Sequence, residues 1–101
     1  MKQQFEAFGM EMQHTVLGNG LQVFYIPKPG FSKTFAMLAT NFGAIDRTFT
    51  MDGVTYDTPA GVAHFLEHKM FEDADGNALQ KFGQTGASPN AFTIYAMTAY
   101  Y

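Results

Sequence analysis

The chain has 101 residues, of which 47% are hydrophobic and 15% charged, and its formal net charge is −3. This length allows one modest hydrophobic core, and the composition indicates a globular chain with no basic surface for nucleic acid. The absence of cysteine excludes disulfides and thiolate ligands, so a bound metal would need histidine and carboxylate ligands.

The first predicted element is a β-hairpin over residues 13–26. Two short apolar runs flank Gly18-Asn19-Gly20, and Asn-Gly accepts the positive φ angles that a tight hairpin turn requires. Residues 27–30 contain two prolines and end the second strand, so a loop is expected to about residue 32. The run over residues 34–42 has the length and composition of a strand. We predict that it is a central strand, buried on both faces.

Residues 44–57 show no helical period, and their aspartates, glycine and threonines predict a crossover loop. A helix is predicted from Pro59 to about Phe71, with Thr58 as its N-cap and Pro59 in its first position. Its apolar residues span a wide surface, so we expect the helix to be buried on more than one side. These apolar residues are Val62, Phe65, Leu66 and Met70.

Residues 73–76 are expected to end this helix, and Asn77 is expected to cap a second short helix that reaches Gly83. Residues 86–89 predict a turn, and residues 91–101 predict one strand that runs to the last residue. The predicted fold is α+β in a single domain over residues 1–101. A mostly antiparallel sheet would combine the hairpin, the 34–42 strand and the terminal strand, with helices packed on one face.

The segment His64-Phe65-Leu66-Glu67-His68 lies on the first predicted helix. Its two histidines are four residues apart, about 6 Å along the helix axis, so both imidazoles can reach one zinc ion. Glu67 can lie beside that ion without binding it and act as a general base toward a metal-activated water. The spacing H-x-x-E-H is the signature of inverzincin peptidases. The alternative is a pair of structural histidines on a polar helix face.

Residues 61–71 closely resemble the active-site helix of the pitrilysin family, which includes insulin-degrading enzyme and the mitochondrial processing peptidase. The resemblance covers about residues 14–101 and looks closest to the bacterial small-chain branch. It extends to Asn19-Gly20-Leu21, Gly43, Gly86-Ala87-Ser88 and Asn90-Ala91-Phe92-Thr93. It implies a zinc-dependent endopeptidase in which His64 and His68 bind zinc and Glu67 is the general base. The chain would then be part of the N-terminal half of a pitrilysin-type αβ domain.

The same resemblance implies that Asn90 and Ala91 lie at the active-site edge strand. There the asparagine would contact the substrate, and backbone groups would pair with an extended peptide. Pro89 supports an edge position, because proline in sheets is confined to edges. Without the histidine motif, an asparagine before a strand would indicate only turn chemistry.

The family's third zinc ligand is a glutamate many tens of residues beyond the second histidine, and only 33 residues follow His68 (101 minus 68). Glu72 cannot replace it, because it would lie about 12 Å from His64 along a helix. His14 is predicted to be structural. The aspartates are predicted to be loop and cap residues, namely Asp46, Asp52, Asp57, Asp73 and Asp75. We therefore expect an incomplete zinc site in this chain alone.

Two other functions share this pattern. S-ribosylhomocysteine lyase carries the same pentad but completes its metal site with cysteine, which this chain lacks. A non-catalytic accessory subunit of a pitrilysin-type peptidase is the remaining alternative. The expected partners are a peptide substrate and a missing C-terminal half or related subunit, in a homo- or heterodimer, with neither nucleic acid nor membrane. A cytoplasmic location is expected, because no run approaches the ~20 apolar residues that span a bilayer and no apolar signal region is present.

Overall fold

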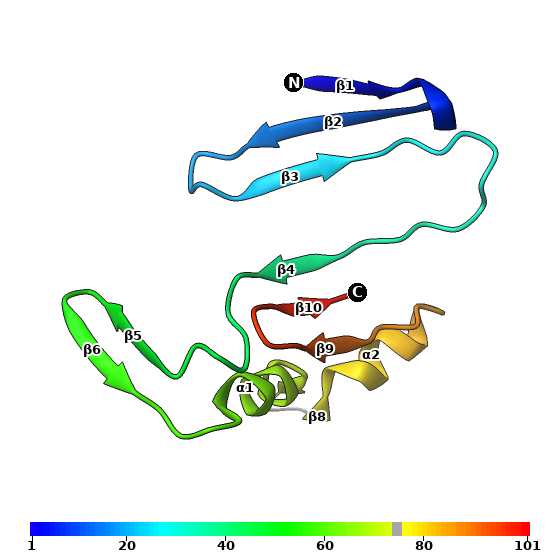
Figure 1. Ribbon diagram of the computed structural model, residues 1–101. Helices are drawn as coiled ribbons and strands as arrows, with labels where there is room; N and C mark the ends of the chain where they lie inside the picture. Colours follow the sequence, from blue (N-terminus) through cyan, green and yellow to red (C-terminus); the bar gives the residue numbers. More distant parts are fainter. Residues whose placement is uncertain (74–75) are drawn as a thin grey trace. The chain divides into compact units, whose positions relative to one another are not determined.

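The computed structural model describes residues 1–73 and 76–101 and shows an α+β fold, as predicted (Figure 1). The chain divides into two compact units, Met1–Thr34 and Phe35–Tyr101. Each unit has its own antiparallel sheet. In the described ranges, no helix has the length and apolar character needed to span a membrane.

The first unit is a three-stranded sheet in the order β1-β2-β3. Its strands are β1 (Lys2–Phe5), β2 (Met10–Val16) and β3 (Gln22–Tyr25), with the short 3-10 helix η1 (Glu6–Phe8) after β1. The pairing of β2 with β3 confirms the predicted hairpin. Its turn contains Gly20 at φ 85°, and the Asn19 side chain accepts a hydrogen bond from the Leu21 backbone. The sequence pattern missed β1.

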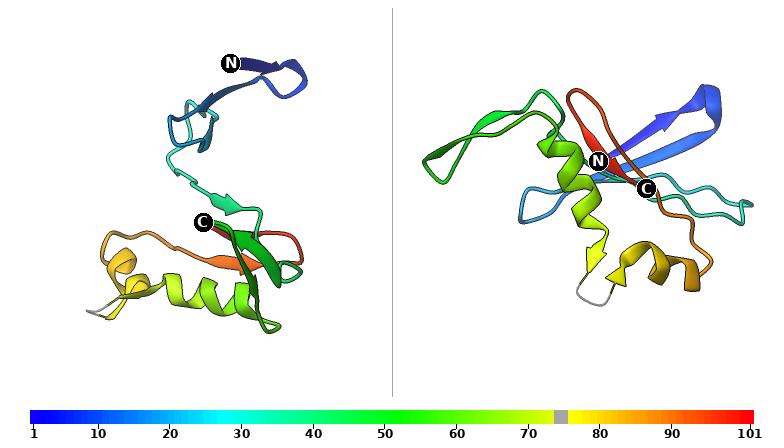
Figure 2. Two further views of the ribbon diagram at one scale, coloured as in Figure 1. Left: turned by 90° about the vertical axis from the view of Figure 1, so that its left-hand side faces the viewer. Right: turned by 90° about the horizontal axis from the view of Figure 1, so that it is seen from below.

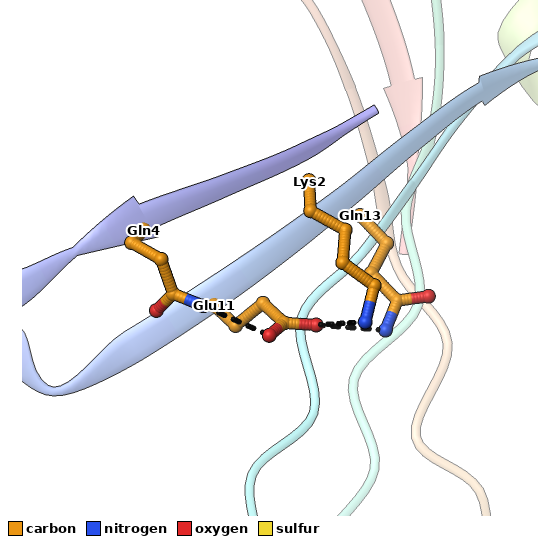
Figure 3. A network of polar contacts seen from close by, with 4 residues as sticks. All are labelled: Lys2, Gln4, Glu11 and Gln13. Atoms are coloured by element: carbon orange, nitrogen blue, oxygen red, sulfur yellow. Dashed lines mark hydrogen bonds and ion pairs between the residues drawn. The ribbon is translucent and has the colours of Figure 1, made fainter.

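A polar network joins β1 to β2 on one face of this sheet (Figure 3). The Glu11 carboxylate accepts hydrogen bonds from the amides of Gln4, at 2.9 Å, and Gln13, at 3.0 Å, and it pairs with the Lys2 ammonium at 3.2 Å. The hydrogen bond from Gln13 and then the one from Lys2 lower the pKa of Glu11 below its ordinary value of 4.5. The network therefore stabilises the ionised form of Glu11.

The second unit is built around a sheet in the order β4-β10-β9. Its strands are β4 (Leu38–Thr40), β9 (Ala91–Thr93) and β10 (Thr98–Tyr100), all antiparallel to their neighbours. Helix α1 (Val62–Met70) packs on one face of this sheet, against β9 and β10 (Figure 2). The strands β7 (Glu72–Asp73) and β8 (Gly76–Asn77) form a small ladder before helix α2 (Ala78–Gln84). Asn77 caps α2 as predicted, accepting from the Leu79 backbone at 2.8 Å.

The prediction of a long central strand over residues 34–42 is wrong. Only Leu38–Thr40 is a strand, and it lies at the edge of its sheet. Among the described residues, β4 pairs with β10 alone, and β10 is three residues long. The strand is therefore limited to the three residues that find a partner. The hairpin β2-β3 belongs to the β1-β2-β3 sheet of the first unit and not to the β4-β10-β9 sheet.

The loop predicted over residues 44–57 contains a second hairpin instead. Strands β5 (Thr48–Met51) and β6 (Val54–Asp57) pair in register across Asp52-Gly53. Both turn residues have positive φ, 52° and 78°, as a two-residue hairpin turn of the primed type requires. Asp-Gly between β-forming residues is a strong hairpin signal, so this element was predictable.

Helix α1 begins three residues later than predicted and is less buried. The Thr58 hydroxyl donates to the Arg47 carbonyl at 2.7 Å and caps nothing, and Gly61, at φ 90°, precedes the first helical residue. Only Ala63 and Glu67 are buried on the helix, whereas Phe65 is 62% exposed. The expected burial on several sides is therefore absent from this chain. The helix ends at Met70, and of the residues expected to end it, Ala74 and Asp75 lie outside the described ranges.

The predicted terminal strand is a hairpin, β9-β10. The chain reverses between Ile94 and Met97, where the Ile94 N–H donates to the Met97 carbonyl at 2.8 Å. Gly43 packs against this turn, and an added Cβ would lie under 3.0 Å from backbone atoms of Ile94, Tyr95 and Met97. A side chain at position 43 is therefore excluded by the backbone of the turn.

Candidate active site

The three polar residues of the pentad lie on one side of α1. Glu67 is 8% exposed and faces the sheet, one turn after the buried Ala63. His64 and His68 are also one turn apart, and both are exposed. The helix therefore places an enclosed carboxylate next to two imidazoles that are open to solvent.

The two imidazoles converge. The Nε2 atoms of His64 and His68 are 3.0 Å apart, and the ring centroids are 4.8 Å apart. Two nitrogens that each bind a tetrahedral zinc ion at roughly 2.0–2.1 Å would be about 3.3 Å apart. The pair therefore fits a single zinc ion with little adjustment. In the absence of an ion, one imidazole can donate a hydrogen bond to the other in suitable tautomers.

Glu67 completes a compact cluster with the histidines. One ligand-type atom from each of His64, Glu67 and His68 lies within 4.8 Å of the other two. Across the part of the chain that the structure describes, no second trio of such side chains comes this close. The residues singled out by the sequence pattern are thus brought together as predicted.

A contact from the sheet holds Glu67, and the sequence pattern did not reveal it. The Thr93 hydroxyl, on β9, donates a hydrogen bond to Oε2 of Glu67. Thr98 is paired with Thr93 in the ladder, is 3% exposed and donates to the Phe42 carbonyl at 2.8 Å. The one available signal was the period-two alternation, which places Thr93 and Ala91 on the same face of a strand.

Tyr100 lies on the same side of the sheet, with its ring 5.8 Å from the ring of Phe71 just after α1. Burial raises the pKa of the Tyr100 hydroxyl, and the nearby negative charge of Glu67 raises it further. Tyr100 is therefore neutral near pH 7 and adds no charge beside the carboxylate.

The residues Asn90 and Ala91 lie at the start of β9, an edge strand of the sheet. Asn90 exchanges both backbone hydrogen bonds with Tyr101, at 2.6 and 2.8 Å. Because pairs alternate in an antiparallel ladder, the backbone groups of Ala91 and Thr93 point away from β10, toward the free edge. The Asn90 side chain accepts from the outward Ala91 N–H at 2.8 Å.

The other acidic side chains have local roles. Glu72 lies in β7 beyond the helix and pairs with Lys69 at 2.6 Å. Asp46 accepts from the Gly43 N–H at 2.7 Å, and Asp57 accepts from the Thr48 hydroxyl at 3.0 Å. Asp52 occupies the hairpin turn. Asp46 and Asp52 are loop and turn residues, as predicted, whereas Asp57 ends strand β6 and Asp73 belongs to strand β7. Asp75 lies outside the described residues.

His14 belongs to the other unit of the chain. Its ring stacks on Phe24 at a centroid distance of 4.5 Å, within the pair β2-β3. Its Nε2 atom is buried and has no hydrogen-bond partner among the described residues. The packing of the ring agrees with the structural role expected for this histidine.

A helix that presents two histidines and a glutamate above an antiparallel sheet defines a candidate mononuclear metal centre. The solved structure of an M16-like peptidase from Alicyclobacillus acidocaldarius superimposes with a TM-score of 0.84 and 41% identity, over 99% of this chain and 23% of that one. YmfH of Bacillus subtilis, which is named as an uncharacterized zinc protease, is 46% identical over 96% of this chain and 23% of its own length. PqqL of Haemophilus influenzae, also named as a zinc protease, is 32% identical over 92% of this chain and 10% of its own.

No model of a protein family matches the chain. The relatives named as zinc proteases and the closely superimposing M16-like peptidase nevertheless indicate the same family. The chain belongs to the pitrilysin-type, or M16, peptidase family. It spans 23% or less of the length of these relatives.

Proposed function

We propose that the protein containing this chain is a zinc-dependent endopeptidase, with His64 and His68 as zinc ligands and Glu67 as the general base. The observation that carries this proposal is the 3.0 Å separation of the two Nε2 atoms beside an enclosed carboxylate. The names of the relatives support both zinc and proteolysis. When bound, zinc supplies a Lewis acid that makes a water molecule acidic near neutral pH.

The residues of this chain then have distinct tasks. Glu67 accepts a proton from the attacking water and later gives it to the leaving amine nitrogen, so the carboxylate is regenerated in each cycle. Its low exposure keeps bulk water from competing for the carboxylate. The exposed side of the two imidazoles leaves room for a peptide to approach.

We further propose that the free edge of β9 binds the substrate backbone. Ala91 and Thr93 direct their backbone groups outward there, as strand addition requires. Asn90 lies at the end of this edge, and its side chain satisfies the Ala91 N–H at 2.8 Å. A peptide that pairs with Ala91 would displace this contact and free the Asn90 amide to contact the substrate.

A catalytic zinc site needs three protein ligands and an open position. The described residues supply two imidazoles, and the nearby acidic groups are engaged elsewhere, as Glu72 is with Lys69. We propose that the third ligand comes from sequence outside these 101 residues or from a related subunit.

The decisive test compares the full-length wild type with Glu67→Gln in hydrolysis of a mixture of fluorogenic peptides. Loss of a general base lowers kcat by about 10²–10⁴-fold, while the zinc content of the purified protein stays the same. Stoichiometric zinc without hydrolysis by the wild type would favour a non-catalytic accessory subunit. Equal hydrolysis by both proteins would refute the role of Glu67.

A further inference from the structure

The Thr93–Glu67 hydrogen bond joins the strand at the proposed substrate edge to the proposed catalytic helix. Thr93 lies 26 residues along the chain from Glu67, and its hydroxyl donates to Oε2 of the carboxylate. The contact is partly buried, and Glu67 itself is 8% exposed. A carboxylate has a second oxygen, Oε1, which this contact leaves available.

The neighbouring Thr98 sets the direction of this hydrogen bond. Each hydroxyl has one proton to donate. Thr98 is 2.8 Å from the Phe42 carbonyl and 3.4 Å from the Thr93 hydroxyl, so its proton goes to Phe42. An ionised Glu67 has no proton to give, so Thr93 is the donor in their contact. The hydrogen bond from Thr98 to Phe42 thus leaves the Thr93 hydroxyl free to donate to Glu67.

We propose that Thr93 is a positioning residue that holds Glu67 so that Oε1 faces the reacting water. This inference rests on the proposed function. Because Oε2 is occupied, the proton taken from water is received at Oε1 and leaves from Oε1 to the amine. Thr93 neither gains nor loses a proton in the cycle.

The position of Thr93 also aligns the base with the substrate. Thr93 and Ala91 lie two residues apart on β9, so both side chains are on the face toward α1 and both backbones are directed to the free edge. A peptide paired along this edge is thereby placed relative to the same strand that holds the carboxylate. One element therefore fixes both the substrate and the general base.

The test uses three variants of the full-length, zinc-loaded protein: Thr93→Val, Thr93→Ser and Thr55→Val. Valine keeps the shape of threonine and removes the hydroxyl, whereas serine keeps the hydroxyl. Thr55 is an exposed threonine of β6 whose hydroxyl lies 3.0 Å from that of Thr50, which makes it a matched control. Each variant is measured for kcat, KM, zinc affinity and the position of the Glu67 carboxylate in a metal-free crystal structure.

We expect Thr93→Val to lower kcat by about 10–100-fold, with KM and zinc affinity changed less than about twofold. Thr93→Ser should restore most of the loss, and Thr55→Val should match the wild type. In the metal-free Thr93→Val crystal, the carboxylate should leave its wild-type position. Wild-type kcat in Thr93→Val, or equal loss in the serine variant, would overturn the proposal.

The metal-free crystal structures of the variants test the role of Thr93 independently of peptide hydrolysis. If the wild type hydrolyses no peptide, the proposed function fails, and the carboxylate position still decides the role of Thr93. An unmoved Glu67 in the Thr93→Val crystal then rules out positioning by the hydroxyl. A displaced Glu67 shows that Thr93 positions this side chain, even though the protein is then not a peptidase.

Discussion

The Thr98 hydroxyl is a buried polar group whose hydrogen bond contributes directly to stability. It donates to the Phe42 carbonyl at 2.8 Å from a residue that is 3% exposed. Thr98→Val would leave that carbonyl without its partner, and we expect the free energy of unfolding to fall by about 1–3 kcal/mol. Urea denaturation measures this. A change as small as that of the exposed Thr50→Val, about 0.5 kcal/mol or less, would contradict the assignment.

Glu11 makes the first unit sensitive to acid. Hydrogen bonds from Gln13 and Lys2 hold the pKa of Glu11 below 4.5 in the folded state. The unfolded chain therefore binds a proton first as the pH falls, and this contribution to stability, fully present above 4.5, is lost as the pH falls through the lowered pKa. Glu11→Gln should flatten the dependence of stability on pH between about pH 6 and pH 3. Glu6→Gln, which removes an equal charge, is the control, and an unchanged slope in Glu11→Gln would contradict the role of the network.

The chemistry of the site was predictable at the level of residues only where it was local. His64, Glu67 and His68 are brought together by helical spacing alone, and Asn90 directly precedes the edge strand β9, whose first residue is Ala91. Thr93 was not assigned a role, because its contact joins a helix to a strand 26 residues away. No local pattern specifies such a contact.

Among the elements of the second unit, the turn at residues 43–46 packs closely on the loop between β9 and β10, and a substitution of Gly43 tests this packing. Ala44 and Ile45 donate to the carbonyls of Ile94 and Tyr95 at 3.0 and 2.9 Å, which leaves no room for a side chain at position 43. We expect Gly43→Ala to lower the free energy of unfolding by about 1–3 kcal/mol or more.

Gly83→Ala is the matched control for this prediction. Gly83 lies inside α2, and an added Cβ there would meet no atom within 4 Å. Alanine at a helical position is expected to stabilise by about 0.5–1 kcal/mol. Thermal unfolding of the two variants should therefore shift in opposite directions, and equal shifts would argue against the close approach at Gly43.

Elements with a local signal were predictable, and those set by distant pairing were not. The turn at Asn19-Gly20 and the cap Asn77 each identified their element correctly. Asp52-Gly53 is the same kind of signal and forms the turn between β5 and β6, where the missing helical period had predicted only a loop. The edge position of β4 depends on its pairing with β10, whose residues are about 60 positions away, and the composition of residues 34–42 contains no information about that partner.

At the scale of the whole molecule, the chain alone should be a weak zinc binder. It spans 23% or less of its relatives and presents two imidazoles beside the proposed base. We expect the isolated 101-residue chain to bind zinc at least 10-fold more weakly than the full-length protein and to hydrolyse no peptide. Competition with a fluorescent zinc chelator measures the affinities. Equal affinities would show that no further ligand is supplied.

The exposed apolar side chains of α1 agree with this view of the molecule. Phe65 and Met70 are each 62% exposed, and exposed apolar side chains that gather on one surface are typical of a surface that another part of a protein covers. The relatives are more than four times longer than this chain, because the chain covers at most 23% of their length. Further chain is thus available in such relatives to cover surfaces of this kind.

Anomalous diffraction at the zinc edge from crystals of the zinc-loaded full-length protein shows whether His64 and His68 bind zinc. We expect one strong peak roughly 2.0–2.1 Å from Nε2 of both His64 and His68, with the Glu67 carboxylate beside the ion and not bound to it. A zinc peak elsewhere, with the two imidazoles still hydrogen-bonded to each other, would contradict the proposed zinc site.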